Sequence, residues 1–278
     1  MSDRRLTPAN GRVAAQHLKG IVAADSYVLG ERARMVGAVT DLCAKPGGKR
    51  DRQVLRGAGV TVFERRDGWA FVQADADGYV GYVTETALGD DATTTHRVGT
   101  AATHAYDGES FKSQDVMHLP FGAQVRVIDE RHKMFETDAG YIPKKHLRPL
   151  DQPFRDPVTV AQAFFGVPYL WGGNSTRGID CSGLVQAGLL ACGIYCPGDS
   201  DMQMAELGEE IAPDAPVQRG DLMFWKGHVG IMVDAEVMLH ANAHHMAAVY
   251  EPIAAATIRI KAQGDGAVLA RKRLTYRV

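Results

Sequence analysis

The sequence predicts an α+β protein, with a β-rich first half and a second half that combines helices with a sheet. In the first half, short β-like runs alternate with turn residues, and their order occurs twice. In the second half, a cysteine stands between a glycine-rich loop and an apolar run of helical spacing. At 278 residues, the chain is long enough for two or three domains.

Residues 1–35 are predicted to form an N-terminal helical segment. Thr7 is placed as the N-cap, and Pro8 takes the first position of a short helix, where its missing N–H costs nothing. The remainder of this segment is expected to pack against the β domain that follows it.

Two small β-barrels are predicted at residues 36–90 and 98–150. Their aligned runs are 59–65 with 123–131, 78–83 with 140–143, and 87–88 with 146–147. A unit of about 50 to 60 residues that occurs twice is typical of duplicated barrels. Two prolines in 151–157 mark the next boundary, so a third domain is predicted at 156–278.

The third domain is expected to begin with an amphipathic helix at 158–165, and a second helix starts near Cys181. Asp180 is the expected N-cap of this second helix, and Gly193 is expected to end it. Unpaired backbone N–H groups and the helix dipole favour a negative charge in the first turn. We therefore expect a lowered pKa for the Cys181 thiol and a thiolate nucleophile. The alternative is a small buried cysteine without chemistry.

Two histidines mark predicted strands further along the chain. His228 begins the second of two strands joined by a Lys-Gly turn, and His240 ends a third strand. In adjacent antiparallel strands the two side chains can lie side by side, so that one contacts the thiol and the other sets its tautomer. Each could instead be a satisfied core histidine. Residues 274–278 are expected to add a closing strand.

These segments resemble the NlpC-type family of papain-like cysteine peptidases, which cut bacterial cell-wall peptides. The resemblance extends from about Val158 to the C-terminus, and it implies a papain-like catalytic domain. It also implies that Cys181 is the nucleophile, His228 the general base and acid, and His240 the residue that orients His228. The Gly-Tyr-aliphatic strand ends of the first half resemble bacterial SH3-like domains, which often accompany these peptidases.

The resemblance also implies substrate-binding residues around the nucleophile. Tyr169 corresponds to a tyrosine beside the thiol, whose hydroxyl is expected to donate to the oxyanion or to a substrate carbonyl. Trp171, two positions later, is also assigned to substrate binding, and core packing of Tyr169 next to Trp171 is the alternative. Asp180 and Ser182, on either side of Cys181, are assigned to substrate binding as well.

Relatives with SH3-like domains imply two further parts of the substrate site. A segment matching 197–203 lines their pocket for a D-glutamyl residue; here Ser200 would take the free α-carboxylate and Asp199 would orient the loop. A helix cap is the alternative for both.

In the same relatives, the first SH3-like domain closes one end of the cleft. An acid, a tyrosine and the aspartate before the nucleophile hold the amine of an N-terminal L-alanine. The corresponding residues here are Asp51, Tyr79 and Asp180, although Asp51 stands where the relatives usually have a glutamate. For Tyr79, packing within the barrel is the alternative. We expect Asp180 to be a buried carboxylate that stays unpaired until an ammonium group binds.

Composition and patterning exclude several other classes of protein. A net charge of −2 without a basic block argues against nucleic acid as the main partner. No run of about 18 apolar residues indicates a membrane span, and the polar N-terminus lacks the apolar region of a signal peptide. The protein is therefore expected to be cytoplasmic. Four cysteines in a chain of this length suggest no disulfide framework.

No metal and no cofactor are expected. Cys192 and Cys196 are spaced as a ligand pair but lack a second pair at zinc-finger spacing, so packing is the better account. His240 and His244 would share a face only in a helix, and the residues around them read as strands joined by a turn.

We therefore expect a cysteine peptidase that hydrolyses the γ-D-glutamyl bond to a diamino acid in peptides of the form L-Ala-γ-D-Glu-diamino acid. A free N-terminal L-alanine and a role in murein peptide recycling follow from the resemblance to cytoplasmic relatives. The alternatives are an acyltransferase or amidase on the same fold, an endopeptidase acting on intact peptidoglycan, and a binding module with an inactive peptidase.

Overall fold

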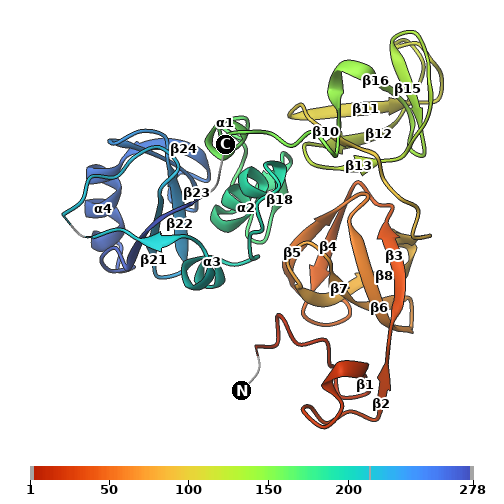
Figure 1. The fold of residues 1–278 in the computed structure, drawn as a ribbon, viewed down its shortest axis with the longest axis horizontal. Coiled ribbons are helices and arrows are strands. Elements are labelled where there is room, and N and C mark those ends of the chain that lie inside the picture. Colours follow the sequence, from red (N-terminus) through yellow and green to blue (C-terminus); the bar gives the residue numbers. More distant parts are fainter. Residues whose placement is uncertain (1–2, 213, 276–278) are drawn as a thin grey trace. The chain divides into compact units, whose positions relative to one another are not determined.

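Residues 3–212 and 214–275 are described by the computed structural model, in which the chain splits into two units at Leu150 (Figure 1). The first unit is built from β-strands, and the second combines four α-helices with a six-stranded sheet. The predicted α+β class is therefore confirmed. Among the described residues, no helix is long and apolar enough to cross a membrane.

The N-terminal segment does not form the α-helix that was predicted for it. It contains β1 (Val13–Ala15), the 3₁₀ turn η1 (Gln16–Leu18) and β2 (Ser26–Val28), and β1 pairs with β2 in parallel. The backbone N–H of Ala15 donates to the carbonyl of Pro8, so the chain folds back where a helix was expected. A short isolated helix is marginal in water, and strand pairing satisfies the same backbone groups.

A seven-stranded antiparallel sheet follows, in the order β5-β4-β8-β7-β6-β3-β9. Its elements are β3 (Glu31–Met35), β4 (Val39–Cys43), β5 (Arg50–Leu55), β6 (Gly59–Arg66), β7 (Trp69–Ala74), β8 (Val80–Thr84), the 3₁₀ turn η2 (Glu85–Ala87) and β9 (Leu88–Gly89). The first β domain therefore begins before residue 36, because β3 pairs with both β6 and β9. Within the described chain this sheet is open rather than a closed barrel.

The second β domain repeats this pairing pattern. Its elements are β10 (His96–Val98), β11 (Ala102–Tyr106), β12 (Asp115–Pro120), β13 (Gln124–Val125), β14 (Val127–Glu130), β15 (Met134–Thr137), β16 (Gly140–Pro143), the 3₁₀ turn η3 (Lys144–His146) and β17 (Leu147–Pro149). β10 pairs with β13 and β17 as β3 pairs with β6 and β9, and β11 pairs with β12 and β16 as β4 pairs with β5 and β8. The predicted repeat is thus present in the strand pairing.

The second unit begins with α1 (Pro157–Gln162), shorter than the predicted helix. Asp156 is its N-cap and accepts from the backbone N–H of Val158 at 3.0 Å, and Pro157 stands at the helix start. Tighter turns follow, and the chain leaves them through Gly166, whose φ of +81° suits glycine. β18 (Asn174–Ser175) and β19 (Gly178–Ile179) then form a small hairpin before the nucleophile helix.

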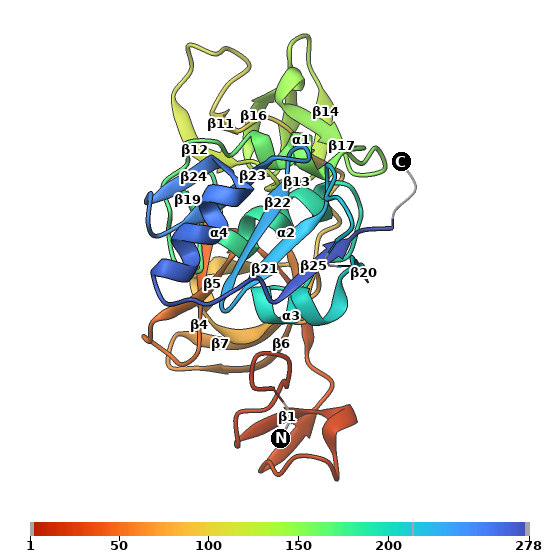
Figure 2. The same cartoon turned by 90° about the vertical axis from the view of Figure 1, so that its left-hand side faces the viewer.

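A six-stranded sheet, ordered β20-β25-β21-β22-β23-β24, forms the centre of this unit. Its elements are β20 (Glu209–Glu210), β21 (Leu222–Trp225), β22 (His228–Met232), β23 (Val237–Asn242), β24 (Ala247–Pro252) and β25 (Ala270–Arg273). The helices are α2 (Cys181–Ala191), α3 (Ser200–Glu206) and α4 (Ile253–Ala262). α2 and α4 lie on opposite sides of the sheet in both views (Figures 1 and 2).

Alternation along the strands divides the core of this unit between the two helices. Met223 and Trp225 of β21, Met232 of β22 and Met238 of β23 pack with Ile260 of α4. The side chains between these positions point to the other face, where α2 packs on β22 and β23. Side chains alternate along a strand, so His228 on the strand of Met232 and His240 on the strand of Met238 point to the α4 face as well.

The closing strand lies earlier than predicted. β25 ends at Arg273, so Leu274 and Thr275 are outside it and Tyr276–Val278 lie outside the described residues. β25 lies between β20 and β21, and its Arg273 donates two hydrogen bonds, of 2.9 and 2.8 Å, to Asp221.

Candidate active site

Cys181 is the first residue of α2, as predicted. Asp180 has an extended backbone and caps the helix, with Oδ1 accepting from the backbone N–H of Gly183 at 2.7 Å. Gly193 follows the helix end with a φ of +75°, which matches the predicted stop.

The Cys181 thiol lies against the turn that starts β22. Sγ is 3.9 Å from the carbonyl oxygen of Gly227, and the backbone N–H of Val229 donates toward the sulfur. These two residues flank His228, which places the thiol beside the backbone of the candidate base. The side chain of Cys181 is buried, with 7% exposure.

The expected low pKa of the thiol is wrong. Burial, the largest effect, and the negative charge of Asp180 together raise the pKa of Cys181 to about 12. Backbone N–H groups, including that of Ser182, act in the opposite direction but are outweighed. The thiol is therefore protonated at neutral pH, and a base must remove its proton during attack.

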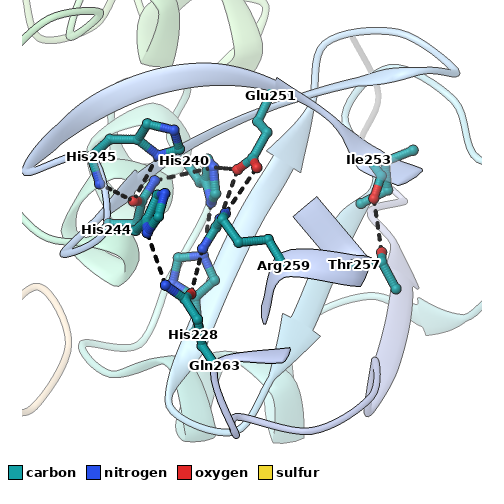
Figure 3. A network of polar contacts seen from close by, with 10 residues as sticks. His228, His240, His244, His245, Glu251, Ile253, Thr257, Arg259 and Gln263 are labelled. Carbon is teal, nitrogen blue, oxygen red and sulfur yellow. Dashed lines mark hydrogen bonds and ion pairs between the residues drawn. The ribbon is translucent and has the colours of Figure 1, made fainter. Parts of the chain in front are cut away.

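His228 is held in the form that such a base requires. Its Nε2 lies 2.8 Å from Nδ1 of His240 on the adjacent strand, as Figure 3 shows. Burial above all, and the neighbouring His240 next, lower the pKa of His228 to about 3. The imidazole is neutral at physiological pH, so one ring nitrogen carries a free lone pair. The Trp225 ring, 5.8 Å from the imidazole, covers it from the paired strand.

His240 is fully buried and contacts the ion pair between Glu251 and Arg259, which the sequence analysis did not predict. Its Nε2 lies 2.9 Å from Oε2 of Glu251 on β24. Arg259 of α4 donates to both oxygens of Glu251, from Nε at 2.9 Å and from Nη2 at 2.7 Å (Figure 3). The sequence signal that could have indicated this role is a single glutamate near the end of an otherwise uncharged strand that follows the strand of His240.

The same cluster was the site of the alternative metal prediction. One ligand atom each from His240, His245 and Glu251 lie within 4.8 Å of one another. Both oxygens of Glu251 already accept hydrogen bonds from Arg259. The carboxylate is therefore engaged, and the guanidinium beside it would repel a metal cation. His244 lies in the turn between β23 and β24 and contacts Gln263 at 2.9 Å. That turn was predicted, and it removes the helical face that a His240–His244 pair would need.

Tyr169 lies close enough to Cys181 for the charge state of the thiol to affect the pKa of the tyrosine hydroxyl. Burial raises the pKa of Tyr169, and so do the charge of Asp180 and the charge that Cys181 gains at high pH, so the tyrosine hydroxyl remains a donor at neutral pH. Its backbone N–H donates to Met246 at 2.9 Å, and it bridges to Ile179 just before the nucleophile. Trp171 is 69% exposed, which rules out the alternative that it packs in a core with Tyr169.

Asp180 is buried but not unpaired, so that expectation is wrong. Besides Gly183, its carboxylate accepts from the backbone N–H of Gly172 at 2.8 Å and from the hydroxyl of Ser182 at 3.1 Å. The Ser182 side chain is thereby committed to the helix cap. The roles of Asp180 and Ser182 toward substrate stay predictions.

The predicted glutamyl segment leads into α3. Asp199 takes the N-cap position with an extended backbone but makes no side-chain capping bond, and Ser200 is the first helical residue. Gln203, which the sequence did not single out, is fully buried and donates to the carbonyls of Ser182 and Pro197, both at 3.0 Å. It ties this segment to the turn that follows the nucleophile. Substrate contact by Asp199 and Ser200 stays a prediction.

Asp51 and Tyr79 belong to the first unit. Asp51 pairs with Arg4 at 3.0 Å. Tyr79 is buried, with Arg52 5.6 Å above its ring and Asp77 accepting from its backbone N–H at 3.0 Å. Packing within the first β domain is thus one role of Tyr79. Amine binding by Asp51 and Tyr79 stays a prediction.

The arrangement suits acyl transfer through a covalent intermediate. It offers a protonated thiol against the backbone on both sides of a neutral histidine, a second histidine bonded to the first, and a tyrosine hydroxyl as donor. None of the four cysteines forms a disulfide. Cys196 is buried and Cys192 partly exposed, so the expected packing holds for Cys196 more than for Cys192.

Comparison with known proteins agrees with this geometry. Residues 166–259 match the NlpC/P60 family model, and residues 42–88 match the model of the bacterial dipeptidyl-peptidase SH3 domain. Dipeptidyl-peptidase 6 of Lysinibacillus sphaericus is 27% identical over 68% of this chain and 79% of its own length. The gamma-D-glutamyl-L-lysine dipeptidyl-peptidase of Bacillus subtilis (strain 168) is 38% identical over 31% of each chain.

A solved structure extends the likeness to both units. The crystal structure of an NlpC/P60 family protein from Bacillus cereus ATCC 10987 superimposes with a TM-score of 0.72, covering 88% of this chain and 99% of that one. At 18% identity, this match concerns the fold. The predicted resemblance is confirmed by these matches.

Proposed function

We propose that this chain, whose residues 166–259 match the NlpC/P60 family model, is a cysteine peptidase that hydrolyses cell-wall peptides at a γ-D-glutamyl bond. The preferred substrate is L-Ala-γ-D-Glu-diamino acid with a free N-terminal amine. The observation that carries the proposal is the thiol of Cys181 lying against the backbone on both sides of His228, while His228 bonds His240.

The reaction follows from the positions of these groups. His228 uses Nε2 toward His240, so Nδ1 is the nitrogen that accepts the Cys181 proton as Sγ attacks the γ-carbonyl carbon. The tetrahedral oxyanion receives donors from the start of α2 and from the Tyr169 hydroxyl. The imidazolium then gives its proton to the leaving amine, which departs as the C–N bond breaks and a thioester forms. Water, deprotonated by His228, cleaves the thioester and restores the thiol.

The choice of substrate rests on the relatives and on the accompanying domain. Two relatives are named as dipeptidyl-peptidases, and one of them is named for a gamma-D-glutamyl-L-lysine bond. The SH3 model matched by residues 42–88 is named for the same class of enzyme. A dipeptidyl-peptidase recognises the amine two residues before the cleaved bond. A cytoplasmic enzyme of this kind would act on released fragments, in murein peptide recycling.

The test is direct assay of the purified chain with L-Ala-γ-D-Glu-diaminopimelate, with product identified by mass spectrometry. Release of free diaminopimelate by the wild type, and none by Cys181→Ser, is expected. Cleavage of intact peptidoglycan in preference to the tripeptide would overturn the proposal in favour of a wall endopeptidase. Transfer of the L-Ala-γ-D-Glu group to an added amine, without hydrolysis, would overturn it in favour of an acyltransferase.

A further inference from the structure

We propose that Glu251 and Arg259 are positioning residues that set the tautomers of both active-site histidines, with Asn242 as the competitor they overrule. This inference rests on the proposed function of Cys181 and His228. Neither Glu251 nor Arg259 has a contact with the thiol among those described, so they act through His240 rather than on substrate.

The first step is the charge of Glu251. Arg259 donates to Oε1 and Oε2 in a fork, and the side chains are 17% and 10% exposed for Arg259 and Glu251. A bidentate guanidinium–carboxylate pair with this little water around it keeps the carboxylate ionised. Arg259 is held in turn by Gln263, whose Oε1 accepts from Nη1 at 2.7 Å. Glu251 is therefore an acceptor and offers no proton to His240.

The second step is a competition at Nε2 of His240. Oε2 of Glu251 lies 2.9 Å from this nitrogen and requires a proton on it. Nδ2 of Asn242 lies 3.1 Å from the same nitrogen and would require it to be bare. Oδ1 of Asn242 accepts from the backbone N–H of His245 at 2.8 Å, so the amide is held with its NH₂ toward His240. The charge-assisted bond is the shorter and the stronger, so Glu251 prevails and Nε2 carries the proton.

The third step is the effect of the His240 tautomer on the tautomer of the candidate base, His228. With Nε2 protonated, neutral His240 has a bare Nδ1, which accepts from Nε2–H of His228 across 2.8 Å. His228 then has a bare Nδ1 for the thiol proton. If Asn242 prevailed, His240 would carry its proton on Nδ1, the Nε2 of His228 would have to be bare, and its Nδ1 would be protonated. In that tautomer His228 cannot accept the proton of Cys181.

The experiment compares Glu251→Gln with the wild type. The amide carries no charge, so control of His240 passes to Asn242 and the catalytically useless tautomer of His228 gains population. The kcat is expected to fall about a hundredfold or more, with KM within about twofold, by analogy with loss of an orienting carboxylate. In the wild type without substrate, ¹⁵N–¹H spectra of the imidazoles should show Nε2–H for both histidines; in Glu251→Gln, Nδ1–H signals should appear.

Rescue separates tautomer control from simple damage to the fold. Asn242→Asp in the Glu251→Gln background replaces the competing donor by an acceptor at the same nitrogen. This double variant should regain at least about tenfold in kcat and return the Nε2–H signals. A matched control is Asp221→Asn, which breaks another buried carboxylate–arginine pair, with Arg273, at the opposite end of the β21–β22 hairpin from His228. It should lower the unfolding midpoint and leave kcat and the tautomers unchanged.

Two results would overturn the inference. One is a kcat of Glu251→Gln within twofold of the wild type. The other is an unchanged Nε2–H tautomer of His228 in that variant, whatever its activity. The spectra need no substrate, so they decide the inference even if the proposed peptide is not cleaved. Failure of the proposed function would appear separately, as a wild type with the expected tautomers and no hydrolysis.

Discussion

Oδ2 of Asp180 accepts a hydrogen bond from the backbone N–H of Gly172 at 2.8 Å, which ties the residue before the nucleophile to the glycine-rich loop. The other oxygen, Oδ1, caps the nucleophile helix at Gly183. One carboxylate therefore sets the position of Cys181 relative to the loop that carries Tyr169. Loop and helix should consequently move together when this residue is changed.

Asp180→Asn is expected to lower the free energy of unfolding of the second unit by about 1–3 kcal/mol. The amide can keep one acceptor bond, but its NH₂ then faces a backbone N–H that loses its partner while buried. Urea unfolding followed by tryptophan fluorescence measures this change, because Trp171 and Trp225 both lie in the second unit. Ser182→Ala, which removes only the weaker bond at 3.1 Å, is the matched control and should cost clearly less. Equal losses in the two variants would contradict the shared-carboxylate account.

The Cys181 thiol should alkylate slowly at neutral pH. Since burial and Asp180 raise its pKa to about 12, the fraction of thiolate keeps rising with pH throughout the accessible range. Iodoacetamide labelling in a Cys192→Ala background, which removes the more exposed thiol, should increase in rate from pH 6 to about pH 9 without a plateau. A plateau below pH 7 would show a preformed thiolate and contradict the buried, protonated state.

His228→Ala should abolish hydrolysis, whereas His240→Asn should retain part of it. Asparagine can still present an oxygen to Nε2–H of His228 and so preserve the useful tautomer, but it no longer connects to Glu251. A fall in kcat of about ten- to a hundredfold is expected for His240→Asn, against at least about a thousandfold for His228→Ala. In the His240→Asn background, Glu251→Gln should have little further effect. A full additional loss there would mean that Glu251 acts by a route other than His240.

The second unit should lose stability as the solution is acidified below pH 6.5. Burial lowers the pKa of His228 to about 3 and that of His240 to about 4, from 6.5 for an ordinary histidine. Between these values the unfolded chain binds protons that the folded one excludes, so stability is complete above pH 6.5 and declines as pH falls toward the folded pKa values. Urea midpoints at pH 7, 6 and 5 measure the slope. His240→Asn removes one titrating group and should flatten it; an unchanged slope would contradict the assignment.

Acetylation of the substrate amine should reduce kcat/KM by about a hundredfold or more. The reason is that a dipeptidyl-peptidase site places acceptors where the ammonium binds, and an amide cannot supply its charge. The measurement is hydrolysis of L-Ala-γ-D-Glu-diaminopimelate against its N-acetyl form. Asp51→Asn and Tyr79→Phe, compared singly, test whether the first unit contributes to this preference. Equal rates for both peptides in the wild type would contradict a requirement for the free amine.

Local patterns in the sequence were sufficient for Cys181, its helix and the strands that carry His228 and His240. Capping residues, glycine stops and period-two runs act within a few residues of the feature they determine. The repeat of the two β domains was predicted for the same reason, but the order in which their strands pair was not.

The features that could not be predicted depend on contacts between distant segments. Glu251 gains its role only when β24 aligns with β23 and α4 brings Arg259 over that face. The raised pKa of Cys181 is a consequence of burial, which outweighs the helix N-terminus. The expected helix after Thr7 gave way to pairing between β1 and β2, which lies beyond local propensity.

Arg259 and Glu251 approach the histidines from the α4 side, while the nucleophile helix packs on the other face of the sheet. The residues that set the histidine tautomers are therefore separate from those that would contact substrate. A small molecule that separates Arg259 from Glu251 would slow the enzyme without resembling its substrate. Such an inhibitor would show noncompetitive kinetics, and resistance to it would arise in α4 rather than in the substrate-binding loops.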